Sequence, residues 1–200
     1  MTLPRFIGIT GAAGAGKDTV ANVLVAGHGF TRYGLADPIK KLLNERFGWT
    51  TDQWNDRGWK EQAEWDWGSG RTGDDARAAF SPRSWAQWLG TEVGRYIGGE
   101  DVWVNQLLRA WRDARYDDCT CTVRFVVPDV RFDNEAIAIR RAGGVILKVA
   151  REGAEQAVQA HISEAGVNFN YVDASIQAPY PGTEILIERA LTALEWVNDN

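Results

Sequence analysis

The chain has 200 residues, of which 44% are hydrophobic and 24% charged, and its formal net charge is −5. Such a length and composition predict one globular domain with a sizeable core. The acidic balance argues against bulk binding to nucleic acid or to an anionic membrane surface. No apolar run approaches the roughly 18–20 residues of a membrane span.

The two cysteines lie close together, at Cys119 and Cys121. This Cys-Thr-Cys spacing is poor geometry for a disulfide, and no histidine lies nearby to complete a structural zinc site. We therefore expect a reducing, cytoplasmic environment. The N-terminal residues lead directly into an apolar strand, so no signal peptide is predicted.

The most informative stretch joins a strand to a helix near the N-terminus. An apolar run from Arg5 to Ile9 predicts a buried strand, and Asp18 to Ala26 have the pattern of a helix. Between them lies the Gly-x-x-x-x-Gly-Lys spacing of a P-loop, made by Gly11, Ala12, Ala13, Gly14, Ala15, Gly16 and Lys17. Glycines let backbone N–H groups approach phosphate oxygens, and a helix N-terminus attracts the anion. Because Lys17 adds a positive charge for the β- and γ-phosphates, the segment predicts nucleoside triphosphate binding.

The residue after the P-loop lysine departs from the usual motif. A Ser or Thr that ligates Mg²⁺ is common there, whereas this chain has Asp18 followed by Thr19. A carboxylate binds Mg²⁺ directly or through water. The sequence leaves open which of the two residues serves the metal.

The next elements are a short strand and a helix. Residues 30–33 predict a second strand, and Asp37 with Pro38 predicts an N-cap and first turn for a helix that runs to Phe47. Lys40 lies near the start of this helix, where the helix dipole disfavours a cation. It is either solvated or directed toward phosphate, and the local motif by itself favours the solvated alternative.

Residues 49–80 are rich in tryptophan and charge, and their second part has the Gly-Ser-Gly composition of an exposed loop. One interpretation is a lid over a phosphate site, to which Arg71 or Arg77 contributes a positive charge. The other is a surface insertion anchored by its tryptophans. The sequence does not decide between them.

Ser81 and Pro82 predict the start of a helix that ends at Gly98-Gly99. Most of its aromatic residues have core spacing, as do Trp85 and Trp88. A polar stripe follows at four-residue steps: Arg83, Gln87, Thr91 and Arg95. This stripe is either a solvated face or the floor of a site that reads a base and a phosphate.

The second half of the chain alternates strands with helices. Strands are predicted at 122–128, 145–149 and 171–176, and helices at 101–115, 134–142 and 183–197. Asp129, Arg131 and Arg151 follow strands, at the edge where ligands bind in open α/β sheets. Asp133 is predicted to be a structural N-cap, whereas Asp129 is where a P-loop enzyme places its metal-orienting carboxylate.

Six motifs, in order and spread over nearly the whole chain, together resemble phage-type deoxynucleoside monophosphate kinases. They are Gly-x-x-x-x-Gly-Lys-Asp-Thr-Val-Ala (11–21), Leu-Ala-Asp-Pro-Ile-Lys (35–40), Ser-Pro-Arg-x-x-x-Gln-x-x-Gly-Thr-Glu-x-x-Arg (81–95), Asp-Val-Trp-Val (101–104), Asp-Val-Arg-Phe-x-Asn-Glu (129–135) and His-x-Ser-Glu (161–164). The Asp after the P-loop lysine is usual in that family. Six ordered motifs are far more specific than a P-loop alone.

The resemblance implies an α/β P-loop fold over residues 1–200, with a five-stranded parallel sheet in the order 2-3-1-4-5 and with residues 49–80 as a lid or nucleotide-binding insertion. It implies transfer of the γ-phosphoryl group of ATP to a deoxynucleoside monophosphate with Mg²⁺, in the host cytoplasm if the chain is phage-encoded. A homodimer is a further expectation, although the sequence does not fix the oligomeric state.

The resemblance also assigns residues to roles. Gly11 to Thr19 would hold the donor phosphates, with Asp18 and Asp129 at the metal. Lys17, Asp37, Lys40 and Arg131 would act on the transferring group. The acceptor would be bound by Asp37, Lys40, Arg83, Gln87, Thr91, Arg95, Asp129, Arg131, Arg151, Ser163 and Glu164.

Two alternative functions use similar sequence features. Dephospho-coenzyme A kinases and phosphomevalonate kinases share the core, and only the motifs at 81–95 and 129–135 argue against them. A nucleotide-binding switch or regulatory ATPase would need no acceptor. The chain lacks the Asn-Lys-x-Asp segment that reads guanine, which argues against a GTPase.

Overall fold

A computed structural model describes residues 2–62, 81–118, 122–152, 166–179 and 181–199. The chain divides into two compact units. The sheet unit comprises Met1–Leu35 and Glu100–Asn200, and the helical unit comprises Ala36–Gly99. Within the described ranges, no helix combines the length and the apolar character needed to cross a bilayer.

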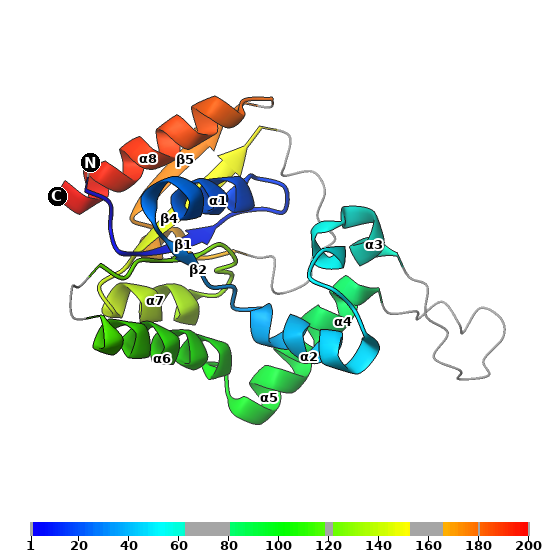
Figure 1. Ribbon diagram of the computed structural model, residues 1–200. Helices are drawn as coiled ribbons and strands as arrows, with labels where there is room; N and C mark the ends of the chain where they lie inside the picture. Colours follow the sequence, from blue (N-terminus) through cyan, green and yellow to red (C-terminus); the bar gives the residue numbers. More distant parts are fainter. Residues whose placement is uncertain (1, 63–80, 119–121, 153–165, 180, 200) are drawn as a thin grey trace, which may run out of the picture. The chain divides into compact units, whose positions relative to one another are not determined.

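The sheet unit contains five parallel strands in the order β2-β3-β1-β4-β5 (Figure 1). The strands are β1 (Phe6–Thr10), β2 (Thr31–Arg32), β3 (Phe125–Val127), β4 (Val145–Arg151) and β5 (Ala174–Ala178). In the central strand, Gly8 pairs with Val127 on one side and with Ile146 on the other. A Cβ atom at Gly8 would lie 2.7 Å from the Ile146 Cδ1 atom, so glycine lets the helix-facing side chains close over β1. The predicted topology and strand order are confirmed.

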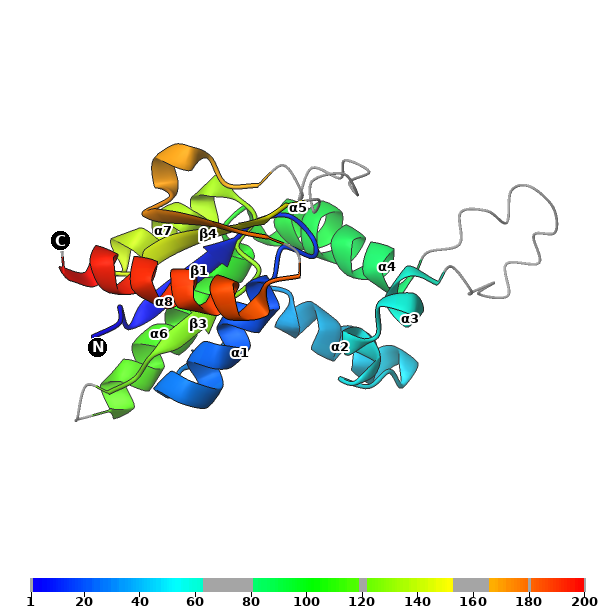
Figure 2. The same ribbon diagram turned by 90° about the horizontal axis from the view of Figure 1, so that it is seen from above.

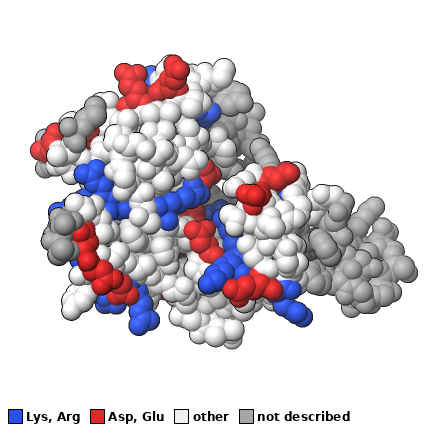
Figure 3. Space-filling view, in the orientation of Figure 1, with Lys and Arg blue, Asp and Glu red and all other residues white. Residues whose placement is uncertain are grey.

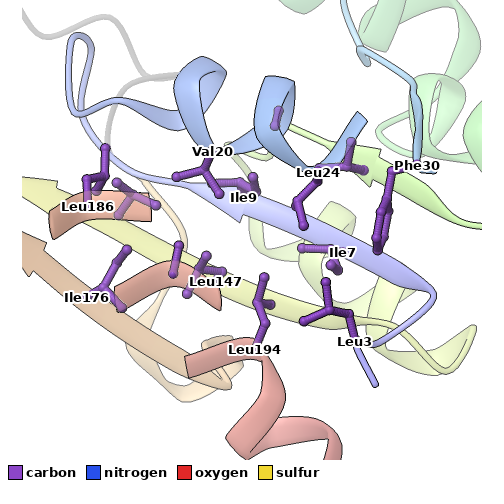
Figure 4. Close-up of a cluster of buried hydrophobic side chains, with 14 of the residues drawn as sticks. Leu3, Ile7, Ile9, Val20, Leu24, Phe30, Leu147, Ile176, Leu186 and Leu194 are labelled. Carbon is purple, nitrogen blue, oxygen red and sulfur yellow. The ribbon is translucent and has the colours of Figure 1, made fainter. Parts of the chain in front are cut away.

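Helices cover both faces of this sheet, as a parallel sheet requires (Figures 1 and 2). Helices α1 (Lys17–His28) and α8 (Thr183–Asp199) lie on one face, and α6 (Val102–Asp117) and α7 (Asp133–Arg141) lie on the other. The first core includes Ile9, Leu24, Leu147, Leu186 and Leu194 (Figure 4). The second includes Phe6, Leu107, Val127, Ile139 and Ile146. Two apolar layers therefore fix the carboxyl ends of the strands, from which the functional loops leave.

The helical unit is built around aromatic rings. Its elements are α2 (Asp37–Phe47), the 3-10 helix η1 (Gln53–Asn55), α3 (Arg57–Glu61), α4 (Pro82–Trp88), the π-helix η3 (Leu89–Val93) and α5 (Gly94–Gly98). Trp49, Trp54 and Trp59 pack edge to face, with ring centroids 5.2–5.6 Å apart. The Trp54 indole N–H donates to the Asn44 side-chain oxygen at 2.7 Å. This part of the tryptophan-rich segment therefore supplies the core of the helical unit, whereas Arg71 and Arg77 lie outside the described residues.

The helix that begins at Ser81 contains a π-helical turn that the sequence did not predict. Its start agrees with expectation, because the Ser81 hydroxyl accepts a hydrogen bond from the Ser84 N–H at 3.2 Å. The prediction that Trp88 belongs to the core is wrong: its ring packs edge to face on Trp85 but is 40% exposed. The wider turn at Leu89–Val93 then changes the helical phase for the residues that follow.

Two predicted helix caps are wrong by one residue. Helix α2 begins at Asp37 itself, with Ala36 in the N-cap position, and the Asp37 carboxylate pairs with Lys40 at 3.5 Å. Helix α7 begins at Asp133, and the N-cap position is Phe132. Asp133 nevertheless has a structural role, because its Oδ1 atom accepts from the Asn168 N–H at 2.7 Å. In both cases the first main-chain hydrogen bond of the helix starts one residue earlier than predicted, because the carbonyl groups of Ala36 and Phe132 accept it.

Four strands differ in length from their predictions. Strand β2 is confined to Thr31–Arg32, within the predicted residues 30–33. Strand β3 begins only at Phe125, since the Asp118 carboxylate accepts from the N–H groups of Thr122 and Val123. Strand β5 begins at Ala174, since Phe169–Tyr171 form a 3-10 turn (η6). Strand β4 continues through Arg151, two residues beyond the predicted end.

Candidate active site

The P-loop leaves the carboxyl end of β1 and returns into α1, as predicted. Gly11 has a φ of 142°, and a Cβ atom there would lie 2.1 Å from the Val149 carbonyl oxygen. Gly16, at the N-cap of α1, has a φ of 97°, and a Cβ atom there would lie 2.5 Å from Leu186. Both positions require glycine for conformation and for space. The loop is thus fixed between β4 and α8, with the positive end of α1 at its close.

Lys17 occupies the first position of α1 and turns back over the loop. Its ammonium group donates to the carbonyl oxygens of Gly11 and Ala12, each at 2.7 Å. These contacts hold the cation against the backbone of the loop that is predicted to bind phosphate. The geometry fits the predicted role of Lys17 as a charge for the donor phosphates.

Asp18 pairs with Arg32, a residue for which no role is predicted from the sequence. The Arg32 Nη2 atom lies 2.6 Å from Asp18 Oδ1, and Arg32 Nη1 lies 3.3 Å from Asn22 Oδ1. Arg32 is the last residue of β2, 14 residues from Asp18 along the chain. The sequence does not predict the contact with Arg32, because the local spacing of Arg32 is the same as that of an ordinary surface arginine.

Asp129 follows β3 directly and ties two loops together. Its Oδ1 atom accepts the Leu35 N–H at 2.9 Å, and the next residue, Val130, donates its N–H to the Ile9 carbonyl at 3.2 Å. The predicted metal-orienting carboxylate therefore lies beside the end of β1. Each carboxylate offers the hard oxygen donors that Mg²⁺ prefers, and Mg²⁺ in kinases takes only one or two of them from the protein. Asp18 and Asp129 each have carboxylate oxygens of this kind, one in the first turn of α1 and one after β3.

Glu135 holds the loop that carries Arg131. Its side chain is 95% buried (5% exposed), and Oε2 accepts the N–H groups of Arg131 at 2.9 Å and Phe132 at 3.1 Å. The Arg131 residue itself is exposed. Glu135 belongs to the motif at 129–135, but no role is predicted for it from the sequence. The available signal is its place at the third position of a helix, where Glu is a known capping residue.

Arg151 lies against the P-loop. A Cβ atom built on Gly16 would be 3.6 Å from the Arg151 Nε atom, and Arg151 Nη2 lies 3.4 Å from the Thr183 hydroxyl at the start of α8. Arg151 therefore lies beside the loop that is predicted to bind the donor phosphates. Ser163 and Glu164, which the sequence grouped with Arg151, lie outside the described residues.

The remaining predicted site residues belong to the helical unit. Asp37 pairs with Lys40, and Arg83 Nε lies 3.2 Å from Glu61 Oε1. The other stripe residues, Gln87, Thr91 and Arg95, are half-buried. An α-helix has about 3.6 residues per turn, so side chains four residues apart shift progressively around its axis. A π-helix has more residues per turn, which reduces this shift. The π-helix at Leu89–Val93 thus helps to keep the stripe on one face.

The described surface does not gather charge of one sign on the face seen in Figure 3. Lys and Arg side chains there are interspersed with Asp and Glu side chains. This distribution agrees with the small negative net charge of the sequence. No broad basic field therefore covers the described part of this face.

A parallel sheet in this order, with a P-loop after its central strand, defines the class of P-loop phosphotransferases. The chain belongs to the deoxynucleotide monophosphate kinase family, whose model matches residues 5–68 and 71–179. The family assigns it an activity: it is an ATP-dependent phosphotransferase whose acceptor is a deoxynucleoside monophosphate.

Individual relatives agree with this assignment. A protein of Acanthamoeba polyphaga mimivirus named "Putative deoxynucleotide monophosphate kinase" is 32% identical over 154 residues, which cover 74% of each chain. The solved structure of TT1252 from Thermus thermophilus superposes with a TM-score of 0.50 and 20% identity, over 98% of each chain. This second likeness concerns the fold alone.

Proposed function

We propose that the loop from Gly11 to Thr19 binds the phosphates of ATP and that Lys17 stabilises the charge that develops on the transferring γ-phosphoryl group. The observation that carries this proposal is the position of the Lys17 ammonium group over the Gly11 and Ala12 carbonyls. Phosphoryl transfer needs little covalent help from the protein, so positioning and cationic stabilisation supply most of the catalysis.

Asp18 and Asp129 are the residues that we propose would hold Mg²⁺. Mg²⁺, when bound, neutralises charge on the phosphate oxygens. The chain's own contribution is to orient the two carboxylates, one at the start of α1 and one after β3. Arg131, on the loop anchored by Glu135, adds a further positive charge for the transferring group.

We propose that the helical unit recognises the acceptor. Asp37 and Lys40 on α2 act on the acceptor phosphate, and the polar stripe reads the nucleotide through Arg83, Gln87, Thr91 and Arg95. The support for this is that the π-helix keeps these side chains on one face, where an α-helix would let them drift. Arg151 we assign to the donor phosphates rather than to the acceptor, because it lies against Gly16. Ser163 and Glu164 remain predicted nucleotide contacts.

An acceptor panel tests the range of substrates. ADP release with ATP and Mg²⁺ is measured with dAMP, dGMP, dCMP, dTMP and hydroxymethylated pyrimidine deoxynucleotides, one at a time. We expect at least one of them to stimulate ADP release. ADP release that ignores every acceptor would remove the roles given to the helical unit, and phosphorylation of only dephospho-coenzyme A or phosphomevalonate would do the same.

A matched pair of variants tests the stripe. Arg83→Ala should raise the KM for the acceptor by about tenfold or more, since it removes a charged hydrogen-bond donor, and should leave the KM for ATP nearly unchanged. Glu61→Gln removes the ion-pair partner and keeps the guanidinium group, so the acceptor KM should change by less than about threefold. A larger change in the ATP KM for Arg83→Ala would move Arg83 to the donor side.

A further inference from the structure

The position of Asp18 creates an electrostatic problem for a phosphate-binding loop. Its carboxylate lies in the first turn of α1 and is 73% exposed. This is the end of the helix that attracts anions. A carboxylate in that turn competes with phosphate for the same positive potential and repels the nucleotide. A Ser or Thr at this position would bring no such charge.

Arg32 is placed to offset that charge. Its guanidinium group contacts Asp18 Oδ1 at 2.6 Å and Asn22 Oδ1 at 3.3 Å, so it lies along the exposed side of the first turns of α1. The arginine is held at the end of β2, the edge of the sheet at which ligands bind. Both members of the pair are solvent-exposed, 37% for Arg32, and exposed pairs contribute little to folding stability. The contact therefore matters more for the local potential than for the fold.

We propose that Arg32 is a charge-compensating residue of the donor site: it neutralises Asp18 so that the P-loop can bind the polyphosphate of a nucleotide. The inference rests on the proposed donor role of residues 11–19. It assigns Arg32 a positioning role through Asp18, and it requires no direct contact between Arg32 and the nucleotide.

The test is a double-mutant cycle on ADP binding, measured by calorimetry in EDTA so that no metal contributes. Arg32→Gln should weaken ADP binding about fivefold, because it leaves the Asp18 charge uncompensated. A unit charge about 4 Å from a phosphate in water contributes about 1 kcal/mol of repulsion. Asp18→Asn should bind ADP at least as tightly as the parent chain. Asp18→Asn/Arg32→Gln should bind within about twofold of the parent chain, since the two positions together carry no net charge in either protein.

Asn22→Ala is the matched control, since it removes the second contact of Arg32 without changing any charge, and ADP affinity should stay within about twofold of the parent. Equal ADP affinity of Arg32→Gln and the parent would overturn the proposal. So would equal weakening of the single and double variants, which would mean that Arg32 contacts the nucleotide directly. If Arg32→Gln fails to fold, Asp18→Asn still decides, because weaker ADP binding by that variant contradicts charge competition.

These results separate the proposal from the donor-site assignment beneath it. A parent chain that does not bind ADP would overturn the assignment of residues 11–19, and with it the role of Arg32. A parent chain that binds ADP, combined with an Arg32→Gln variant of unchanged affinity, would overturn the role of Arg32 alone.

Discussion

Lys17, for which we propose a role in phosphoryl transfer, also binds the loop that precedes it. Its ammonium group donates to two carbonyl oxygens of the loop, Gly11 O and Ala12 O. These are neutral acceptors, whereas phosphate oxygens carry charge and make stronger hydrogen bonds. Nucleotide binding should therefore draw the ammonium group from the carbonyls to the phosphates, at little cost to the fold.

Lys17→Ala should lower kcat by at least about 100-fold, because it removes a cation aimed at the transferring group. The midpoint of thermal unfolding should change by less than about 8 °C, because two hydrogen bonds to neutral carbonyls contribute only about 1 kcal/mol each and each kcal/mol shifts a chain of this size by about 2–4 °C. Steady-state ADP release and circular dichroism check the two values. Lys41→Ala, an exposed lysine on α2, is the control that should keep full activity. Normal turnover by Lys17→Ala would contradict the P-loop assignment.

Glu135 gives a second prediction at this scale. Its buried carboxylate accepts two backbone N–H groups in the loop that carries Arg131. Glu135→Ala should lower the thermal midpoint by at least about 6 °C, since each of the two hydrogen bonds to the charged group contributes about 1.5 kcal/mol or more and each kcal/mol shifts a chain of this size by about 2–4 °C. Glu135→Gln keeps an acceptor oxygen and should lose about half as much. Equal midpoints for the parent and Glu135→Ala would show that the loop does not depend on this side chain.

At the scale of secondary-structure elements, the π-helix η3 packs on α2 at Gly90, which has no side chain. A Cβ atom at Gly90 would lie 2.8 Å from the Cδ1 atom of Ile39, which neighbours Lys40. The contact couples the helix that carries Lys40 to the helix that carries the polar stripe. The packing of two elements of the helical unit thus depends on one glycine.

Gly90→Ala should raise the acceptor KM several-fold and leave the ATP KM unchanged, because the added methyl group displaces the Cδ1 atom of Ile39, a buried residue next to Lys40 on α2. Overpacking of this kind costs about 1–3 kcal/mol. Ile39→Val in the same chain removes the Cδ1 atom and should restore much of the acceptor KM. If Ile39→Val restores the stability of the Gly90→Ala chain but not its acceptor KM, the contact serves packing alone.

Considered as a whole molecule, the protein has two units with separate cores, and each unit carries its own set of predicted ligand contacts. The P-loop belongs to the sheet unit, and the polar stripe belongs to the helical unit. Ligands that bind the folded chain raise its thermal midpoint by mass action. The two proposed sites can therefore be separated by their ligands.

ADP and an accepted deoxynucleoside monophosphate, each at about 100 times its Kd, should each stabilise the chain by about 2.7 kcal/mol, or about 5–10 °C. Lys17→Ala should lose most of the ADP shift and keep the monophosphate shift, and Arg83→Ala should do the opposite. Differential scanning fluorimetry measures both. Loss of both shifts in either variant would mean that the two sites are not separable. A homodimer stays a prediction, which sedimentation velocity would test.

The sequence by itself determined the fold class and the location of the P-loop, and the resemblance of its ordered motifs to a known family predicted the strand order. The fold class and the P-loop follow from the glycine spacing and from the alternation of strands with helices. Both patterns reflect local backbone geometry, which residues a few positions apart determine. The Ser81 cap and the structural role of Asp133 were predicted for the same reason, although the cap assigned to Asp133 was wrong by one residue.

Only the tertiary structure decided which side chains meet. The Arg32 contact with Asp18, the position of Arg151 against Gly16 and the packing of Ile39 on Gly90 join residues that lie 14, 135 and 51 positions apart. The π-helix and the tryptophan core depend likewise on how rings and helices fill the helical unit. Such contacts arise from packing among distant segments, and no local pattern in the sequence encodes them.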